Sequence, residues 1–554
     1  MVFSALARVD RNSKRFAEIV RTAAKYRLAD WLGETGHDWI QRHLVSFDGQ
    51  RLGELTREAR IRMTLTELGT TFIKLGQTLS TRADLVGPEL ATELTQLQSQ
   101  TPPDSEEVVR ATIEAELGGA PEEIFAEFDV QPLGSASIAQ VHRARTKDGQ
   151  EVVVKVQHAG IEEKVRNDLD ILLVLAQLAE KHSPQARLYQ PAATATEFRR
   201  TLLRELDFTR ERQNLDQFNK NFADDERVRI PKAFADLSSR RVLTMELFTG
   251  IPFSDGDRLA TTDIDTSDLA SAGANMFLEM IFRDGFYHAD PHPGNLMLLS
   301  GGEIGVLDCG MVGRLDDTLR DEVETMVLAA VSKDADQLTG VVVRIGSLPK
   351  DFDRDALRVE IGEFVADYIG QSLDEFDLSG ALNGMTDIIR RYRIILPPTI
   401  SLLLRVLVML EGTGRLLNPR FSLAGLLQPY YAKAMQRRLS PQVWLRKLQR
   451  TYRDWDRLLD MLPKDLADVL TRLRRGTFDV NLEHRRLDST VNRLVLGILT
   501  AALFLGSTQL WSSEAPPLIG GVSVFGAVGY GLSIFLGFLL FAAIKKSGDI
   551  SPKK

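Results

Sequence analysis

Three polar side chains near the middle of the chain follow the order found in phosphoryl-transfer sites. Asp290 stands two positions after His288, Asn295 follows five positions later, and Asp308 begins the triplet Asp308-Cys309-Gly310. In a kinase the first Asp orients or deprotonates the nucleophile, while the Asn and the second Asp offer the oxygen ligands that Mg²⁺ prefers beside phosphates. This order predicts a kinase-like site for ATP and Mg²⁺, with Asp290 as a catalytic residue and Asn295 and Asp308 as metal ligands.

A strand-rich segment upstream predicts the other half of a nucleotide site. The stretch from Pro132 to Ala144 leads through Lys147-Asp148-Gly149 to the β-branched run from Glu151 to Val156, a pattern typical of a β-hairpin. Lys155 stands where a kinase lysine reaches the α and β phosphates. Glu211, on a later predicted helix, is the candidate partner that holds Lys155 in place, and both join Asp290 as predicted catalytic residues. A lone strand lysine is usually a solvent-facing charge, so this interpretation depends on the complete set.

Other residues are candidates for nucleotide binding. The small-residue loop Gly134-Ser135-Ala136-Ser137 stands where a kinase has a glycine-rich phosphate loop, and its methyl groups limit how the backbone can wrap phosphate. Helices are predicted through Ala179 and from Glu197 to Phe218, before an apolar strand from Arg241 to Leu247 that ends at an expected hinge. Glu246, at the end of this strand, is the sixth nucleotide-binding candidate, beside the four loop residues and Lys155.

The segment from His288 to Gly310, called the catalytic segment below, departs from that of an ordinary protein kinase. Ala289 replaces the arginine that meets an activation-loop phosphate. Soon after Gly310 the chain enters an apparent helix capped by Asp316 or Asp317, and no Ala-Pro-Glu triplet follows. The pattern therefore disfavours a protein substrate.

Two long apolar stretches near the end of the chain predict a membrane hairpin. Leu494 to Trp511 and Leu518 to Ile544 are each close to the ~20 residues that span a bilayer. Arg493 precedes the first stretch and Lys545 and Lys546 follow the second, so the positive-inside rule places both ends in the cytoplasm. We predict a multi-pass protein of the inner (cytoplasmic) membrane with its catalytic domain on the cytoplasmic side. Two buried core helices are the alternative.

Smaller apolar features complete this part of the prediction. Gly529, Ser533 and Gly537 share one face of the second stretch, which would allow close approach of another helix and hence a homodimer. The alternative is that small residues are simply frequent in membrane helices. A third apolar stretch, Thr399 to Leu410, is short and carries Arg405, so we expect a core helix of the soluble body. An amphipathic helix near Phe16 and Ile19 predicts either packing on that body, the commoner case, or contact with a membrane surface.

Charge excludes one class of partner. The 554-residue chain has a net charge of -8, whereas nucleic-acid binding needs a concentrated positive surface. The single cysteine, Cys309, excludes an intramolecular disulfide framework. Six basic residues after Tyr430 are candidates for contact with anionic lipid headgroups, although nearby aspartates make a solvated mixed-charge helix the alternative. They are Arg446, Lys447, Arg450, Arg472, Arg474 and Arg475.

Together these motifs resemble the UbiB family of atypical kinases, also called aarF-domain-containing or ADCK-like kinases. The family's K-x-G-Q signature matches Lys74-Leu75-Gly76-Gln77, its E-x-D signature matches Glu205-Leu206-Asp207, and its Ala-rich loop matches residues 134–137, with Gly134 in place of the more usual alanine. The resemblance implies a lid helix that folds over the active site and pairs Lys74 with Glu205. Lys74, Gln77, Glu205 and Asp207 are thus the predicted regulatory lid residues, which would exclude a peptide.

The resemblance also implies a function. Family members with two C-terminal spans resemble the bacterial protein that supports ubiquinone biosynthesis, through ATPase or small-molecule kinase activity rather than protein phosphorylation. The implied partners are membrane lipids, isoprenoid quinone precursors and quinone-biosynthesis proteins, and no nucleic acid. Two alternatives stay open, namely a protein kinase and a nucleotide-switched lipid-binding scaffold with little turnover.

We therefore predict an α+β, two-lobed protein-kinase-like fold with a helical N-terminal extension and a C-terminal two-helix transmembrane hairpin. The predicted domains are an N-terminal helical region (1–60), a K-x-G-Q helical extension (61–115), a kinase-like N-lobe (116–250), a kinase-like C-lobe (251–430), a basic helical linker (431–493) and the hairpin (494–546).

Overall fold

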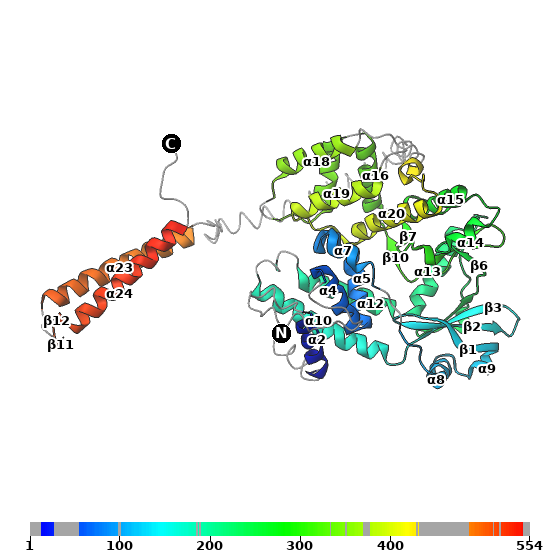
Figure 1. Cartoon of the computed structure of the whole chain (residues 1–554), viewed down its shortest axis with the longest axis horizontal. Coiled ribbons are helices and arrows are strands. Elements are labelled where there is room, and N and C mark those ends of the chain that lie inside the picture. The colour runs from blue at the N-terminus through cyan, green and yellow to red at the C-terminus, as the bar shows by residue number, and fades with distance from the viewer. Residues whose placement is uncertain are drawn as a thin grey trace, which may run out of the picture. The chain divides into compact units, whose positions relative to one another are not determined.

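The computed structural model describes most of the chain as two compact units, Met1–Ser440 and Pro441–Lys554. The first unit is a mixed α+β body, and the second contains two long helices (Figure 1). The predicted class is therefore confirmed for the body. The basic residues from Arg446 to Arg475 lie outside the described residues. The described residues are 13–26, 55–97, 101–183, 187, 190–332, 334–349, 352–368, 377–427, 430, 487–513, 515–519 and 522–546.

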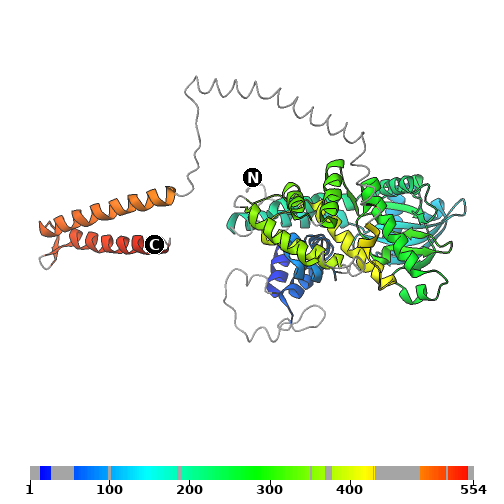
Figure 2. The same cartoon turned by 90° about the horizontal axis from the view of Figure 1, so that it is seen from above.

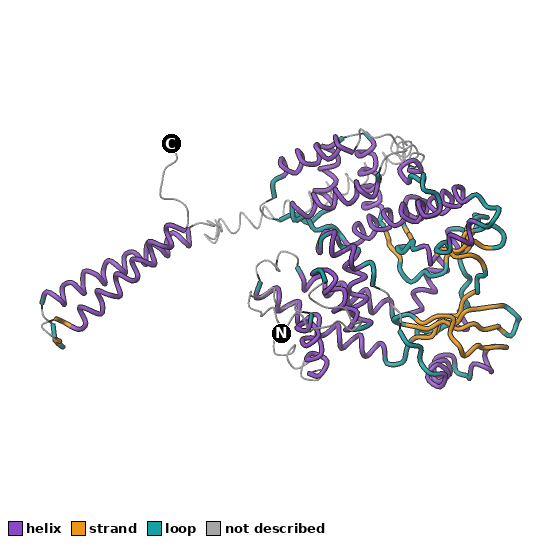
Figure 3. Tube along the Cα trace, in the orientation of Figure 1, coloured by secondary structure: helices purple, strands orange, loops and turns teal. Residues whose placement is uncertain are grey.

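A four-stranded antiparallel sheet in the order β1-β2-β3-β5 forms one lobe of the body (Figure 3). Val152, Val154 and Val156 face a core that includes α8, while Val153 faces the larger core of the body. Since alternate residues of a strand face opposite sides, Lys155 lies on the side of Val153. The elements are α8 (Glu106–Leu117), α9 (Pro121–Ile124), β1 (Phe125–Ser135), β2 (Ala139–Thr146), β3 (Glu151–Gln157) and β5 (Val242–Glu246).

The predicted hairpin of β2 and β3 is confirmed. Lys155 pairs with Val141 across it, and Gly149 in the turn adopts φ +82°, a left-handed conformation that glycine accepts without steric cost. The hairpin thereby fixes the position of Lys155 along the sheet.

The helical segment predicted from Glu197 to Phe218 is helical in the structure but interrupted, because the chain breaks at Leu206 and Asp207. Asp207 is extended, and its carboxylate accepts a hydrogen bond of 3.1 Å from the backbone N–H of Thr209, which caps a new helix. Among the described residues, three α-helices therefore lie between β3 and β5. They are α10 (Ile161–His182), α12 (Pro191–Glu205) and α13 (Phe208–Asn221).

The second lobe carries the catalytic segment on short strands. Asp290 and Asn295 lie between β7 and β8, and Asp308 follows β9. Before β7, Gly285 ends a helix at φ +62°, and a Cβ there would lie 2.8 Å from the carbonyl oxygen of Leu315. The elements are β4 (Val228–Arg229), β6 (Gly250–Pro252), β7 (Phe286–His288), η5 (Pro293–Asn295), β8 (Leu296–Leu299), β9 (Ile304–Val306) and β10 (Val312–Arg314). The 3₁₀ helix η3 (Ala235–Leu237) belongs to the first lobe, where Leu237 packs against the core that includes α8.

Helices surround these strands, and two predictions about them hold. The helix after the catalytic segment begins directly after Asp316, whose carboxylate caps it through a 2.8 Å bond from Leu319 N. The short apolar stretch is a core helix, with Leu403, Val406 and Leu410 buried. The helices are α14 (Gly256–Ala260), α15 (Thr266–Glu279) with the π turn η4 (Met280–Asp284), α16 (Asp317–Val331), α17 (Ala335–Ile345), α18 (Arg354–Tyr368), α19 (Leu378–Arg391) and α20 (Pro398–Leu417).

The N-terminal extension packs on the body. Ile19, Leu68, Phe72 and Ile171 form one buried cluster. The amphipathic helix that carries Ile19 therefore packs on α10 of the body, which is the first of the two alternatives predicted for it. Figure 1 shows the following helices beside α12 and α20. The extension consists of α2 (Ser13–Lys25), α4 (Arg57–Leu68), α5 (Thr70–Ser80), α6 (Ala83–Val86) and α7 (Pro88–Leu94).

The second unit is a pair of helices that run side by side (Figure 2). They are α23 (Leu487–Ser512) and α24 (Val524–Lys546), joined through β11 (Leu518–Ile519) and β12 (Val522–Ser523). The predicted start of the second helix at Leu518 is wrong, because the residues before Val524 form this short strand pair. By length and composition, Leu494–Ser512 and Val524–Phe541 could each cross a membrane.

The face of small residues on α24 contacts α23. A Cβ at Gly529 would lie 2.2 Å from the Ser507 hydroxyl, and one at Gly537 would lie 3.9 Å from Thr500. The face that we considered for contact between copies is thus used within the hairpin itself. The homodimer stays a prediction.

Candidate active site

Lys155 lies between two carboxylates that come from different elements. Its Nζ donates to Oε1 of Glu211 on α13 at 2.5 Å and lies 3.4 Å from Oδ2 of Asp308. The side chains of Lys155 and Glu211 are 11% and 9% exposed, whereas that of Asp308 is 50% exposed. The structure thus brings the predicted lysine and its predicted partner together beside a predicted metal ligand.

The charges of this cluster fix its protonation. Burial acts to lower the pKa of Lys155, but the charges of Asp308 and Glu211 outweigh it and raise that pKa above its usual value. Burial acts to raise the pKa of Asp308, yet the charge of Lys155 and the N–H of Gly310 outweigh it and lower this pKa to about 2. Burial raises the pKa of Glu211 against the attraction of Lys155. Half of Asp308 faces solvent, so the attraction to Lys155 is partly screened.

The Asp-Cys-Gly triplet is held by α13 through its backbone. Asn214 Nδ2 donates to the carbonyl oxygen of Cys309 at 3.0 Å, and the Glu211 carboxylate accepts from the Cys309 N–H. Gly310 N donates to Asp308 Oδ1 at 2.7 Å. We did not predict Asn214, although its place three positions after Glu211 puts it on the same helix face. The triplet and α13 therefore form one unit.

Asp290 and Asn295 contact each other directly. Asn295 Nδ2 donates to Asp290 Oδ2 at 2.9 Å and to the Asp290 carbonyl oxygen at 3.2 Å. Asp290 N donates to His288 Nδ1 at 3.0 Å, and His288 Nε2 contacts the carbonyl oxygen of Asp308. With its amide nitrogen used in this way, and with no donor to its amide oxygen among the described residues, Asn295 can offer that oxygen as an acceptor. His288 links the two halves of the catalytic segment.

Hydrogen bonds to its backbone hold the small-residue loop in place. Ala136 N donates to the Ala139 carbonyl oxygen at 2.9 Å, and His158 Nε2 lies 3.0 Å from the Ala136 carbonyl oxygen. Ser137 is buried, whereas a Cβ added at Gly134 would meet nothing within 4 Å. The loop can therefore accept the alanine that is more usual at position 134. The other loop residue, Ser135, lies 3.4 Å from His158 through its hydroxyl.

Of the predicted lid residues, Lys74 and Glu205 form an ion pair between α5 and the end of α12. The charges of Asp308 and Asp290 also act on Lys74 and help to raise its pKa, although burial opposes them more strongly than either. The other two lid candidates have different contacts. Gln77 donates from Nε2 to the Leu97 carbonyl oxygen at 3.2 Å, and Asp207 caps α13.

Glu246 stands at the end of β5 as predicted, and its side chain is engaged. Its Oε1 accepts from Arg229 Nη2 at 2.7 Å. The backbone N–H of Glu246 donates to the Lys232 carbonyl oxygen at 2.9 Å. Its role in nucleotide binding stays a prediction.

The residues present fit a magnesium nucleotide. Mg²⁺ is usually bound by one or two carboxylates together with substrate phosphates, so it needs no cage of protein ligands. Among the described residues no group of three or more His, Cys, Asp or Glu side chains is arranged to hold a metal. The ionised Asp308 and the amide oxygen of Asn295 are oxygen ligands of the required kind, and Lys155 adds a cation for phosphate.

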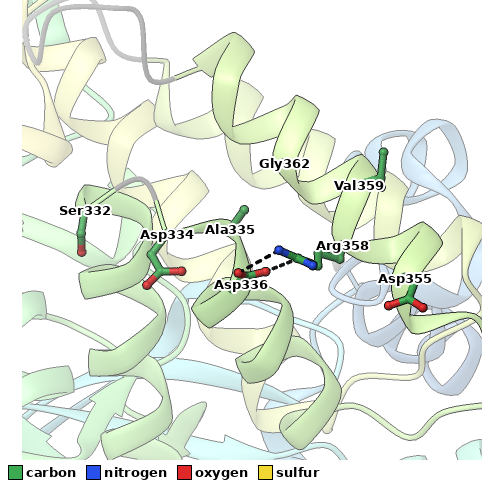
Figure 4. A pocket seen from close by; sticks show the side chains of 8 residues that line it. All are labelled: Ser332, Asp334, Ala335, Asp336, Asp355, Arg358, Val359 and Gly362. Carbon is green, nitrogen blue, oxygen red and sulfur yellow. Dashed lines mark hydrogen bonds and ion pairs between the residues drawn. The ribbon is translucent and has the colours of Figure 1, made fainter.

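A separate pocket of about 740 Å³ lies where α17 meets α18 (Figure 4). Arg358 Nη2 donates to Asp336 Oδ2 across it at 3.1 Å. None of the predicted site residues lines it. Its lining consists of Ser332, Asp334, Ala335, Asp336, Asp355, Arg358, Val359 and Gly362.

Three family models match the chain. They are the ABC1 atypical kinase-like domain over residues 96–342, the UbiB helical domain over 361–422 and the ABC1/UbiB kinase-like C-terminal domain over 481–546. The predicted kinase-like fold is thereby confirmed, whereas the exact domain boundaries stay predictions.

Full-length relatives match as well. A protein named "Probable protein kinase UbiB" from Pseudomonas aeruginosa is 34% identical over 474 residues, which covers 83% of this chain and 87% of the relative. Proteins of the same name from Pseudomonas putida and Azotobacter vinelandii are 34% and 32% identical, each over 91% of this chain and 94% of the relative. A solved Mycobacterium tuberculosis protein in complex with erythromycin is 26% identical over 66% of this chain and 93% of its own, with a TM-score of 0.46.

Proposed function

The chain belongs to the UbiB family of atypical kinase-like proteins, and from that membership we propose that it uses Mg-ATP at a membrane surface to support the biosynthesis of ubiquinone or a related isoprenoid quinone. The observation that carries the proposal is the position of Lys155, 2.5 Å from Glu211 and 3.4 Å from Asp308. A buried cation held between two carboxylates is the arrangement that kinases use to place nucleotide phosphates.

Each residue of the site has one proposed task. Bound Mg-ATP supplies the phosphoryl group that is transferred. Lys155 contacts the phosphates and Glu211 keeps Lys155 in position, while Asp308 and Asn295 would hold Mg²⁺. Asp290 orients an acceptor hydroxyl or a water molecule and can take its proton. The small-residue loop lies over the phosphates.

The lid favours a small acceptor or water over a peptide. Lys74 forms an ion pair with Glu205 and also interacts electrostatically with Asp290 and Asp308. After β10 ends at Arg314, α16 begins at Asp317, which leaves no room for a long activation segment. A protein kinase needs such a segment as a platform for its substrate. Because the relatives are named probable protein kinases, the experiment below also tests for protein phosphorylation.

Two apolar helices support the membrane part of the proposal. Both candidate spans are almost entirely exposed, with 6% and 11% of their residues buried, as expected for helices that lipid covers. Basic residues at the outer ends of the hairpin favour a body on the cytoplasmic side. An isoprenoid substrate would be reached at this surface.

The test measures Mg²⁺-dependent ATP binding and turnover by the full chain in liposomes. Anionic lipid and a phenolic quinone precursor are each added or left out, and we expect both to increase turnover. Asp308→Asn should abolish Mg²⁺-dependent binding and turnover, whereas the matched control Asp268→Asn, at a 61% exposed side chain paired with Arg227, should change neither. Asp308→Asn with full turnover would contradict the metal site. Phosphate incorporated into an added peptide would favour a protein kinase instead.

A further inference from the structure

The catalytic segment lacks a cation of its own. From His288 to Asn295 the chain contains no Lys or Arg. Phosphoryl transfer develops negative charge on the phosphoryl oxygens, and enzymes often place an arginine from another part of the chain against it. A cation for this purpose must therefore come from outside the segment.

Two cations near the site already have carboxylate partners. Lys155 contacts Glu211 and Asp308, and Lys74 pairs with Glu205. Arg405, on α20, differs from both. In the described part of the chain it forms no ion pair with an Asp or Glu, and its neighbours are Met409 Sδ, 3.3 Å from Nε, and the Gln77 carbonyl oxygen, 3.3 Å from Nη1.

The guanidinium of Arg405 has unused hydrogen-bonding capacity. An arginine carries five N–H groups, and the two contacts of Arg405 involve Nε and Nη1 only. Nη2 has no partner among the described residues and is not sealed from solvent. Burial lowers the pKa of Arg405, and the charge of Asp290 acts in the opposite direction. A half-buried cation of this kind gains most from an anion that binds beside Asp290.

Helix α20 holds Arg405 at a fixed position relative to the catalytic segment. Thr413 Oγ1 donates to the Pro291 carbonyl oxygen at 3.1 Å, and Tyr287 OH donates to the Thr399 carbonyl oxygen at 3.0 Å. These bonds join two turns of α20 to the residues on either side of Asp290. The guanidinium therefore does not depend on a mobile loop for its placement.

We propose that Arg405 binds the terminal phosphate of ATP through its unused N–H groups and acts as the arginine that the catalytic segment lacks. The proposal rests on the proposed function, because it assigns a residue to the same nucleotide site. A purely structural role is the rival, in which Arg405 only fastens the lid through Gln77. The two roles differ in which nucleotide they affect, since ADP lacks the terminal phosphate.

The experiment compares the Kd of Mg-ADP with that of the magnesium complex of the β,γ-imido analogue of ATP for the full chain. Arg405→Gln keeps an N–H donor without the charge, and Arg405→Lys keeps the charge without the planar group. We expect Arg405→Gln to weaken binding of the ATP analogue about tenfold or more, as for a lost charge-assisted hydrogen bond, and to leave ADP binding unchanged. Arg405→Lys should retain part of the preference for the ATP analogue over ADP. The control Arg358→Gln changes a 60% exposed arginine outside the site.

Each outcome decides the matter. A selective loss of the ATP analogue with an unchanged unfolding temperature supports the proposal. Equal losses for both nucleotides, or no loss, overturn it and leave Arg405 as a structural contact of the lid. If Arg405→Gln unfolds, Arg405→Lys is measured in its place. Its preference for the ATP analogue over ADP must then be smaller than that of the parent. If the parent binds neither nucleotide, the proposed function fails and this proposal fails with it.

Discussion

Lys155 Nζ and Glu211 Oε1 lie 2.5 Å apart, in a contact that joins β3 to the first turn of α13. Each side chain is about nine-tenths buried, and α13 also holds the Asp-Cys-Gly triplet through Asn214. The contact therefore couples the position of Lys155, the proposed phosphate-binding residue, to that of Asp308, the proposed metal ligand. A helix that moved away from β3 would disturb both.

Glu211→Gln should weaken Mg-nucleotide binding about tenfold or more, because the neutral amide no longer holds the charge of Lys155 in place. Calorimetric titration with Mg-ATP would measure the effect. Glu162→Gln removes a carboxylate that contacts Arg166 and Arg240 on the surface, and it serves as the control. Equal affinities for Glu211→Gln and the parent would count against the proposed role of the pair.

The pairing of Lys155 with Glu211 could be anticipated because the order of strand, helix and catalytic segment determines which residues of a kinase-like fold meet. Contacts that depend on how helices end or cross could not. The break at Asp207 depends on one capping bond to Thr209, and helix periodicity continues through it. Arg405 was recognised only as a charge in an apolar stretch, since its nearness to Asp290 arises from packing of elements over 100 residues apart.

Cys309 should resist alkylation in the native protein. The thiol is fully buried, and burial together with the charges of Asp308 and Glu211 raises its pKa well above the usual value. Because only the thiolate reacts, labelling by iodoacetamide between pH 7 and 9 should require opening of the triplet. Denaturant should restore the rate of a free thiol, and Mg-ATP should slow native labelling further. Since this is the only cysteine, Cys309→Ser provides the blank. Rapid native labelling would contradict the packing of the triplet on α13.

The ion pair of Lys74 and Glu205 should control access to the site. Glu205→Gln is expected to speed the labelling of Cys309 several-fold, because the lid helix loses its charged anchor. The control is Glu93→Gln, which removes the ion pair of Glu93 with Arg62, 2.7 Å apart within the same extension. The pKa of Lys74 is raised above 10.5, so Lys74 should keep its charge at neutral pH, and on the alkaline side the pair should weaken only as pH rises through this higher folded-state pKa. A labelling rate that rises already between pH 6 and 8 in excess of thiolate formation would argue against this anchor.

Two substitutions in the small-residue loop should distinguish the effect of backbone freedom at Ala136 from that of steric room at Gly134. Ala136→Gly frees the loop backbone, so we expect the ratio of ATP to ADP affinity to change. Gly134→Ala should leave the unfolding temperature unchanged, since a Cβ there meets nothing within 4 Å. Titration of both variants with both nucleotides would measure these effects. Identical ATP and ADP affinities in Ala136→Gly and the parent would remove the loop from the nucleotide site.

The contact between the two C-terminal helices gives a prediction about the hairpin alone. In a Cys309→Ser background, cysteines at Thr500 and Gly537 should cross-link on mild oxidation, because a Cβ at Gly537 would lie 3.9 Å from Thr500 Cγ2. Adding Gly529→Leu should reduce the yield severalfold, since even a Cβ there would lie 2.2 Å from the Ser507 hydroxyl, and α24 would have to move away from α23. Gly531→Leu is the matched control, because no atom lies within 4 Å of a Cβ at that position. Cross-link yields in liposomes, read by gel mobility after cleavage between the helices, distinguish the two glycines. If both substitutions reduce the yield equally, bulk alone explains the effect and the close contact at Gly529 does not hold the helices together.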